Sequence, residues 1–182
     1  TNLLILEEAG VTDEDILVCA GNGYADSLSA SAVERPILLV GKSMTDAQKR
    51  FIAERQSSNI YIIGGSDVVP SDIEKTLKDE ENWGRALNVT RLAGATRYQT
   101  STLVAETFFS GDVEKIVLAY GKNFPDGLSG GPLAMEFNAP LILVENSQTA
   151  AAAAFATAKN VQDCVILGDS TLISNAAVNK II

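Results

Sequence analysis

Short apolar runs alternate with longer, mostly amphipathic stretches along the whole chain. In the first half these runs cover residues 16–20, 36–40 and 60–63, and each is almost wholly apolar. Runs of this length and composition are typical of parallel strands that helices cover on both faces. The stretches between them have helical patterns, so the sequence predicts an α/β chain with short parallel sheets and right-handed crossovers.

Capping residues indicate where several helices begin. Thr45 with Gln48, and Ser71 with Glu74, have the Ser/Thr-x-x-Glu/Gln spacing of a capping box. This spacing predicts helix starts after the second and third strands. The second half has its own predicted helices, over residues 100–109 and over the alanine-rich residues 150–159.

The whole pattern occurs twice, because the chain contains an internal repeat. The aligned pairs of segments are 16–29 with 116–129, 36–40 with 140–144, and 61–66 with 165–170. We therefore predict two tandem units, residues 1–83 and 84–182. The first unit lacks a counterpart of residues 91–99.

Composition and charge exclude several classes of function. The chain has 182 residues, of which 46% are hydrophobic and 20% charged, as in an ordinary globular protein. A net charge of −9 repels phosphate backbones, and no apolar run approaches the ~18 residues of a membrane span, so we expect neither nucleic-acid binding nor membrane insertion. Histidine is absent, which removes imidazole catalysis, Ser-His-Asp triads and histidine-ligated metals. We predict no cofactor, no metal site and no catalytic residue.

Three smaller features are expected to have structural and not functional roles. Cys19 and Cys164 lie inside apolar runs, which favours buried, unreactive thiols. The acidic residues 13–15 precede a strand, and we expect a solvated turn there. Trp83, in the polar join between the units, is expected to fasten a loop.

Glycines after the first strand invite a dinucleotide-binding interpretation, but the spacing fails because Asp26 occupies the third glycine position. Asp26 and its counterpart Asp126 are instead expected to cap the helices that follow. A ligand contact stays open as the alternative. Together with Ser29 and Ser129 these residues follow the carboxyl ends of strands, where open α/β sheets place their ligand crevice.

Residues 91–100 are the most distinctive segment of the chain. They combine a strand, a glycine turn at Gly94 and a helix that opens with Arg97 and Tyr98. The helix dipole disfavours a cation at this position, so Arg97 is expected to have an anionic partner, either a ligand or an internal carboxylate such as Asp126.

Four motifs follow one another along the second half of the chain: Arg91-Leu92-Ala93-Gly94-x-x-Arg97-Tyr98-x-Thr100, Asn123 to Leu133, Asn138 to Val144, and Gly168. In this order and spacing they resemble the cell wall binding repeat type 2 family, the anchoring modules of Gram-positive surface-layer and other cell-surface proteins. The resemblance covers nearly all of residues 91–182, and a degenerate copy covers residues 1–77. The first copy departs from the usual pattern around Asp26.

The resemblance implies Rossmann- or toprim-like units that associate with neighbouring repeat units about a pseudo-threefold axis, at an extracellular location in the cell wall. It also implies non-covalent binding of an anionic secondary wall polymer, in which a Pro-Ile-Leu-Leu segment takes part. The corresponding residues here are Pro36, Ile37, Leu38 and Leu39 in the first unit, and Pro140, Leu141, Ile142 and Leu143 in the second.

The net negative charge of the chain does not attract an anionic polymer. Attraction must come from a bridging divalent cation or from local basic groups such as Arg35, Lys42, Arg91, Arg97 and Lys122. Repeated weak contacts would then add through avidity. The alternative function is an enzyme or sensor that binds a small anionic ligand in a crevice near Arg97, Asp126 and Ser129.

Overall fold

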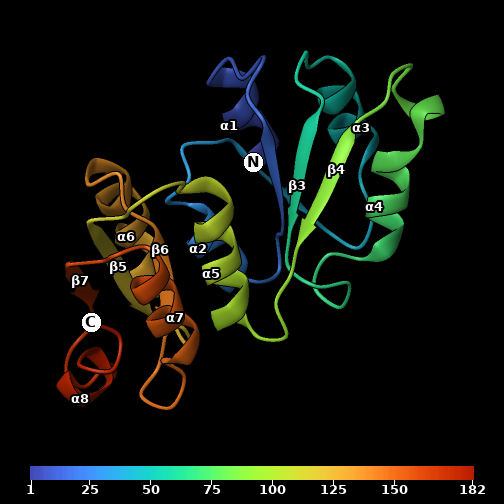
Figure 1. The fold of residues 1–182 in the computed structure, drawn as a ribbon. Helices are drawn as coiled ribbons and strands as arrows, with labels where there is room; N and C mark the ends of the chain where they lie inside the picture. Colours follow the sequence, from blue (N-terminus) through green and yellow to red (C-terminus); the bar gives the residue numbers. More distant parts are fainter. The chain divides into compact units, whose positions relative to one another are not determined.

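The structure is a computed structural model that describes residues 1–182, and the chain divides into two compact units. Unit 1 comprises residues 1–23 and 35–92, and unit 2 comprises residues 24–34 and 93–182. Each unit has one short parallel sheet flanked by helices (Figure 1). The predicted α/β class is confirmed.

Unit 1 is built on a four-stranded parallel sheet, sheet A, with strand order β2-β1-β3-β4. Its elements are α1 (Asn2–Glu8), β1 (Ile16–Ala20), β2 (Ile37–Val40), α3 (Asp46–Ala53), β3 (Asn59–Ile63), α4 (Ser71–Lys78), a 3-10 turn (Glu80–Asn82) and β4 (Asn88–Leu92). All three strands predicted in this half are present, within one residue of the predicted bounds.

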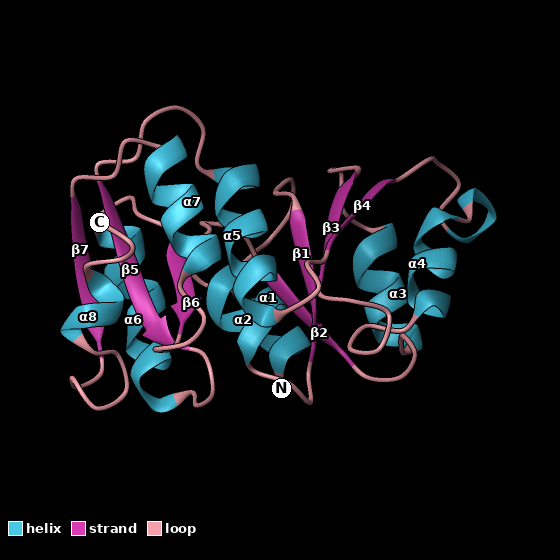
Figure 2. Ribbon diagram, turned by 60° about the horizontal axis from the view of Figure 1, so that its bottom comes forward, coloured by secondary structure: helices cyan, strands magenta, loops and turns pink.

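Unit 2 is built on a three-stranded parallel sheet, sheet B, with strand order β6-β5-β7. Its elements are α2 (Ala25–Ala30), α5 (Arg97–Phe108), β5 (Lys115–Tyr120), α6 (Pro125–Glu136), β6 (Leu141–Val144), α7 (Ala150–Ala158), β7 (Asp163–Leu167) and α8 (Asn175–Val178). In Figure 2 the strands of sheet B lie between α6 and α7.

The compact units do not follow the sequence repeat at two places. Helix α2 comes from the first repeat but belongs to unit 2, and β4 lies beyond the repeat boundary at residue 83 but belongs to unit 1. The two units therefore exchange one element each. The repeat boundary itself stays a prediction about the sequence.

The core of unit 1 covers one face of sheet A. Alternate residues of the central strands, among them Val18 and Ile62, are fully buried against Phe51 of α3 and Leu77 of α4. Trp83 closes this core, and its indole nitrogen donates to the Leu77 carbonyl oxygen at 3.0 Å. The expectation that Trp83 fastens a loop is confirmed.

Sheet B is covered on both faces. On one face Leu118 and Ile142 pack against Phe155 of α7, together with the end of α8. On the other face Val117 and Leu141 join a cluster that includes α6. Burial on both faces explains why β5 and β6 are continuous apolar runs in the sequence.

Helices α2 and α6 pack closely because α6 has glycines four residues apart. A Cβ atom on Gly127 would lie 2.8 Å from Cδ1 of Leu28, and one on Gly131 would lie 2.8 Å from Cβ of Ser31. Both distances are shorter than real Cβ contacts allow. The close approach brings a helix of the first repeat onto the sheet of the second.

At the outer edges of β2 and β6, a polar side chain from α1 or α5 hydrogen-bonds to the strand backbone. Leu39 N–H donates to Oδ1 of Asn2 at 2.8 Å, and the Asn2 amide donates to the Ile37 carbonyl at 2.9 Å. In unit 2, Leu143 N–H donates to Oγ of Ser101 at 3.0 Å. The repeat also aligns residues 1–7 with residues 100–106, which makes Asn2 and Ser101 equivalent. Both units therefore satisfy an edge-strand amide in the same way.

Replacing Ser101 with alanine is expected to lower the free energy of unfolding by about 1.5 kcal/mol, because the Leu143 amide loses its acceptor in a buried position. Urea unfolding monitored by circular dichroism measures this. The matched control is Ser110→Ala, which removes an exposed hydroxyl from the same region and is expected to change little. Equal midpoints for both variants would contradict this role of Ser101.

One predicted capping box is confirmed and the other is wrong. Thr45 and Gln48 form the reciprocal pair of hydrogen bonds at the start of α3. At α4 the N-cap is Pro70, and Ser71 lies inside the helix without a side-chain capping bond. Glu74 is drawn away from the helix end, because it pairs with Lys78 at 2.6 Å and with Arg91 of β4 at 2.7 Å.

Candidate functional site

The candidate site lies at the carboxyl edge of sheet B, where the chain leaves β5 and β6 and where α2, α5 and α6 begin. It consists of five residues, which we call the carboxyl-edge cluster: Tyr24, Arg97, Lys122, Phe124 and Glu145. All five belong to unit 2. Three of them were not predicted as site residues, namely Tyr24, Phe124 and Glu145.

Arg97 is the first residue of α5 and has neutral partners. Its Nη1 donates to the Gly121 carbonyl oxygen at 2.7 Å and to the Tyr24 hydroxyl at 3.2 Å. The guanidinium carbon lies 5.6 Å from the centre of the Tyr24 ring, within cation–π range. The expected pairing with Asp126 is wrong, because a backbone carbonyl and an aromatic ring hold the cation instead. Arg97 is exposed, so its charge remains available to an anion.

Tyr24 and Phe124 form an aromatic pair beside this arginine. Their ring centres are 5.7 Å apart with the planes tilted by 53°, and Phe124 is 46% exposed. They stand at equivalent positions of the repeat, as the N-cap residues of α2 and α6. The signal that sequence analysis missed was this repeated aromatic two residues before the repeated aspartate.

Lys122 and Glu145 form an ion pair at 2.6 Å, and Ser147 Oγ donates to the other oxygen of Glu145 at 2.8 Å. The Lys122 ammonium lowers the pKa of Glu145 from its ordinary value and is itself stabilised in the charged form. Burial, with a smaller effect of Glu145, raises the pKa of Tyr98 to about 12. Tyr98 therefore stays a neutral phenol that packs against Gly121.

Glu145→Gln is expected to lower the free energy of unfolding by about 1 kcal/mol at pH 7, because Lys122 loses its counter-ion. The pKa of Glu145 is lowered in the folded chain, so the stabilisation is present above the ordinary value of 4.5 and fades as the pH falls below it. Thermal unfolding measures this: the difference in melting temperature between the variant and the wild-type chain should be smaller at pH 3 than at pH 7. Glu106→Gln, at an exposed position on α5, serves as the control. A gap that widens in acid would contradict this sign.

The four residues predicted at the strand ends lie in the first turns of α2 and α6. Neither helix has a side-chain capping bond, so Asp26 and Asp126 are first-turn residues that favour the helix dipole and not N-caps. Ser29 is buried and donates to the Asp26 carbonyl at 3.0 Å. Ser129 is exposed and donates to the Asp126 carbonyl at 3.3 Å. Ser129 is thus the more accessible serine, while Asp26 and Asp126 are both half-buried.

The two Pro-Ile-Leu-Leu segments form the edge strands β2 and β6. In unit 2 the residues Pro140, Leu141, Ile142 and Leu143 are all buried. In unit 1, Leu38 is buried while Pro36, Ile37 and Leu39 are half-buried. A part in polymer binding stays a prediction, and the burial of the second segment gives it a structural role in the sheet.

The remaining predicted features have local partners. Arg91 pairs with Glu74 in unit 1 and is largely buried. The acidic residues 13–15 form a turn in which Glu14 accepts from the Thr12 and Asp13 amides. Neither cysteine forms a disulfide; Cys19 is buried and Cys164 is half-buried. Burial raises the pKa of the Cys164 thiol. No group of three or more acidic or cysteine side chains is placed to hold a metal ion.

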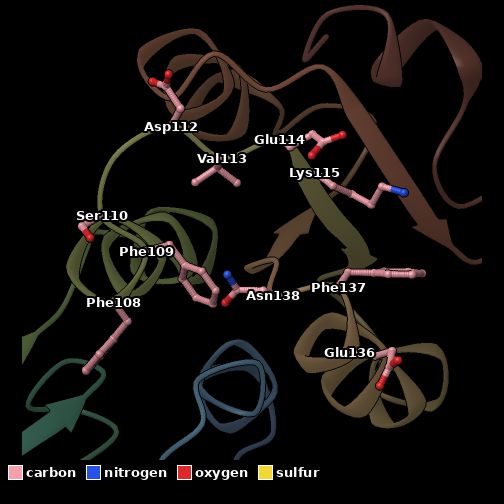
Figure 3. A pocket seen from close by; sticks show the side chains of 10 residues that line it. All are labelled: Phe108, Phe109, Ser110, Asp112, Val113, Glu114, Lys115, Glu136, Phe137 and Asn138. Atoms are coloured by element: carbon pink, nitrogen blue, oxygen red, sulfur yellow. The ribbon is translucent and has the colours of Figure 1, made fainter.

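A pocket of about 620 Å³ opens at the opposite edge of sheet B, where α5 and α6 end and β5 begins (Figure 3). Three carboxylates line it, from Asp112, Glu114 and Glu136. Its one cation, Lys115, pairs with Asp163 at 3.0 Å. This acidic lining disfavours anionic ligands, in contrast to the carboxyl-edge cluster.

Comparison with known proteins identifies the family. The family model described as "Cell wall binding domain 2 (CWB2)" matches residues 1–74 and 91–178. The chain belongs to this family. The CWB2 match ends inside α4 and resumes inside β4, and residue 83, the repeat boundary predicted from the sequence, lies in the gap. Membership supports cell wall binding and an association with the cell surface.

Two relatives of the CWB2 chain come from Bacillus subtilis (strain 168). N-acetylmuramoyl-L-alanine amidase LytC is 25% identical over 187 residues, which cover 100% of this chain and 36% of LytC. The protein named amidase enhancer is 29% identical over 153 residues, covering 84% of this chain and 20% of its own length. The CWB2 chain thus spans about a third or less of these relatives.

Two solved structures share the CWB2 fold. Cwp6 from Clostridium difficile superposes with a TM-score of 0.82 at 22% identity, over 99% of this chain and 29% of Cwp6. Cwp8 from the same organism has a TM-score of 0.72 at 25% identity, over 93% of this chain and 29% of Cwp8. None of the helices in the chain is long and apolar enough to cross a membrane.

Proposed function

We propose that this chain is a non-catalytic module that anchors a larger protein to the Gram-positive cell wall by binding an anionic secondary wall polymer at the carboxyl-edge cluster. Membership in the CWB2 family supports the wall as the target. The observation that supports an anionic ligand is Arg97, an exposed cation at a helix start that has no carboxylate partner.

The position of Arg97 is electrostatically unfavourable in the free chain. The amino end of a helix carries a partial positive charge, so a cation there is destabilised and an anion is stabilised. Helix α6 also begins at this edge, which adds a second partial positive charge. A phosphate or carboxylate of the polymer would relieve the repulsion and accept from the guanidinium.

The aromatic pair suits the carbohydrate part of such a polymer. A ring that is partly exposed and held by a neighbouring ring offers an apolar face at small entropic cost, and the C–H face of a sugar can pack on it. Phe124 presents its ring next to Tyr24, which also contacts Arg97. One sugar and one adjacent charge of the polymer would thus be bound together.

Arg97→Gln is expected to reduce retention of the chain on purified Gram-positive cell walls about tenfold, because the anion loses its cationic partner. The glutamine keeps hydrogen-bonding capacity, and Thr96 still caps α5. A sedimentation assay measures the bound fraction against wall concentration. The matched control, Lys180→Gln, removes the same charge from an exposed position near the end of unit 2.

Acid extraction of the anionic polymer from the walls tests the ligand class separately. Wild-type retention should disappear on stripped walls. Retention that survives stripping would contradict polymer binding, and equal retention of Arg97→Gln and the wild-type chain would place the contact elsewhere. A melting temperature that rises sharply with a small sugar phosphate, but not with wall material, would favour the rival enzyme or sensor.

Modest affinity at one cluster is consistent with an anchoring role. Several units of a repeat protein, each with a weak contact, hold a polymer with much greater avidity than one. We therefore propose that neighbouring repeat units act together with this chain on the polymer.

A further inference from the structure

Sheet B has the arrangement of sheet A without its fourth strand. Strands β5, β6 and β7 pair in the registers of β1, β2 and β3, so that Ile116 lies opposite Cys164 where Ile16 lies opposite Ile60. In sheet A the next position is filled by β4, which pairs in parallel with β3. In sheet B no strand lies beyond β7 (Figure 2).

The missing strand leaves apolar side chains of β7 uncovered. Ile62 of β3 is 0% exposed, whereas its counterpart Ile166 in β7 is 37% exposed. Ile63 is fully buried, and its counterpart Leu167 is half-buried. Among the large apolar residues of the seven strands, Ile166 is the one that is exposed.

The turn after β7 presents the groups that bind β4 in sheet A. Gly64 N–H donates to the Leu92 carbonyl at 2.9 Å, and Arg91 Nη1 donates to the Gly64 carbonyl at 2.8 Å. Gly168 has a similar backbone conformation, with φ of 121° against 109° at Gly64. Among the backbone hydrogen bonds of the turns and loops, none involves Gly168, whereas Gly64 has its bond to Leu92.

Other edge strands in the chain are protected. Asn2 closes β2 and Ser101 closes β6 through their outward backbone groups. Strand β4 carries asparagine, threonine and arginine, the polar composition that discourages further pairing. Strand β7 has the sequence Asp-Cys-Val-Ile-Leu and no such protection.

We propose that the free edge of β7 is a docking site for one parallel strand of the Asn88–Leu92 kind, supplied by a further repeat of this family. The second family match begins at Arg91, inside β4, so the strand that completes sheet A is itself the start of the following repeat. A further repeat would complete sheet B in the same register. In the register of sheet A, the occupant places the counterpart of Val89 opposite Cys164 and the counterpart of Arg91 opposite Ile166. The guanidinium of that arginine would reach the Gly168 carbonyl as Arg91 reaches the Gly64 carbonyl. The proposal is independent of what the carboxyl-edge cluster binds.

A disulfide at Cys164 tests both the occupant and its register. The full chain is extended after Ile182 by a flexible Gly/Ser linker of ~20 residues, which spans about 25 Å on average, followed by a second copy of residues 85–95. In that copy the position of Val89 is changed to cysteine, because Val89 lies opposite Ile60, the counterpart of Cys164. The buried Cys19 is replaced by alanine in all versions.

In a glutathione redox buffer the Val89→Cys copy is expected to form the disulfide with Cys164 at least tenfold faster than a Thr90→Cys copy, whose side chain points to the opposite face of the sheet. Hydrogen exchange of the cysteine-free extended chain, with Cys164→Ser, should slow at residues 163–168 relative to a scrambled copy. Equal disulfide rates for the two positions, a faster rate for Thr90→Cys, or unchanged exchange at residues 163–168 would overturn the proposal.

Discussion

Gly94→Ala is expected to lower the free energy of unfolding by about 3 kcal/mol or more. A Cβ atom at this position would lie 2.7 Å from both the carbonyl carbon of Gln99 and the amide nitrogen of Thr100. Both are backbone atoms of α5, so no rotamer change relieves the overlap and the turn must move off the helix. The Gly94 amide would then lose its bond to Thr100 Oγ1 at 3.0 Å. Urea unfolding at pH 7 measures the change.

The matched control for Gly94→Ala is Gly23→Ala. A Cβ atom on Gly23 meets nothing within 4 Å and its φ is not positive, so the control is expected to lie within about 0.5 kcal/mol of the wild-type chain. A Gly94→Ala chain as stable as this control would show that the turn relaxes without cost. Such a result would remove the steric reason for glycine in the 91–100 motif.

Strands and most helix starts could be predicted because they depend on local sequence. The continuous apolar run at residues 16–20 matches β1 residue for residue. Thr45 and Gln48 form the box that their spacing predicts. Helix α5 opens at Arg97, as the 91–100 motif indicated, three residues before the start predicted from the helical pattern of residues 100–109. In each case the decisive interactions join residues at most a few positions apart.

Predictions failed where a distant residue competes for the same group. The spacing of Ser71 and Glu74 matches a capping box, but Arg91 and Lys78 bind the Glu74 carboxylate more strongly than the helix end does. Arg97 was expected to pair with a carboxylate, but its Nη1 instead donates to the Gly121 carbonyl oxygen at 2.7 Å. Pairings of this kind depend on which loops meet at a sheet edge, and local spacing does not contain that information.

The candidate site was predicted in part. Arg97 and Lys122 were among the basic groups singled out, and the structure brings both to the carboxyl edge of sheet B. Glu145 follows a strand that was correctly predicted, but nothing in its neighbourhood indicates an ion pair with Lys122. The aromatic pair forms because α2, which comes from the first repeat, packs in unit 2. The order of predicted strands and helices along the sequence does not reveal this placement.

One feature of the sequence indicated that α2 could pack closely against another helix, namely small residues four positions apart. Gly127 and Gly131 of α6 align with Ser27 and Ser31 of the first repeat. Small residues four apart on two helices allow a close approach, because backbones meet where side chains are short. The aligned small residues therefore indicated which face of each helix could make a close contact. They did not indicate that the two helices contact each other.

Gly131→Ala tests that contact and is expected to cost a net 2 to 3 kcal/mol of unfolding free energy. The new methyl would lie 2.8 Å from Ser31 Cβ, and this overlap outweighs the ~1 kcal/mol that alanine gains over glycine inside a helix. Combining it with Ser31→Gly removes the Cβ and hydroxyl of Ser31 and leaves one tight contact, 3.2 Å from the Ser31 carbonyl oxygen. The double variant should therefore be more stable than Gly131→Ala alone.

A double-mutant cycle by urea unfolding gives the interaction energy between the two positions. Ser31→Gly alone loses the hydrogen bond from its hydroxyl to the Leu28 carbonyl, so it is expected to be mildly destabilising. Rescue of Gly131→Ala by a variant that is itself destabilising can arise only if the two side chains compete for the same space. Strictly additive effects would mean that α6 shifts away from α2 when the methyl is added, and that the glycines are not what holds the helix of the first repeat on sheet B.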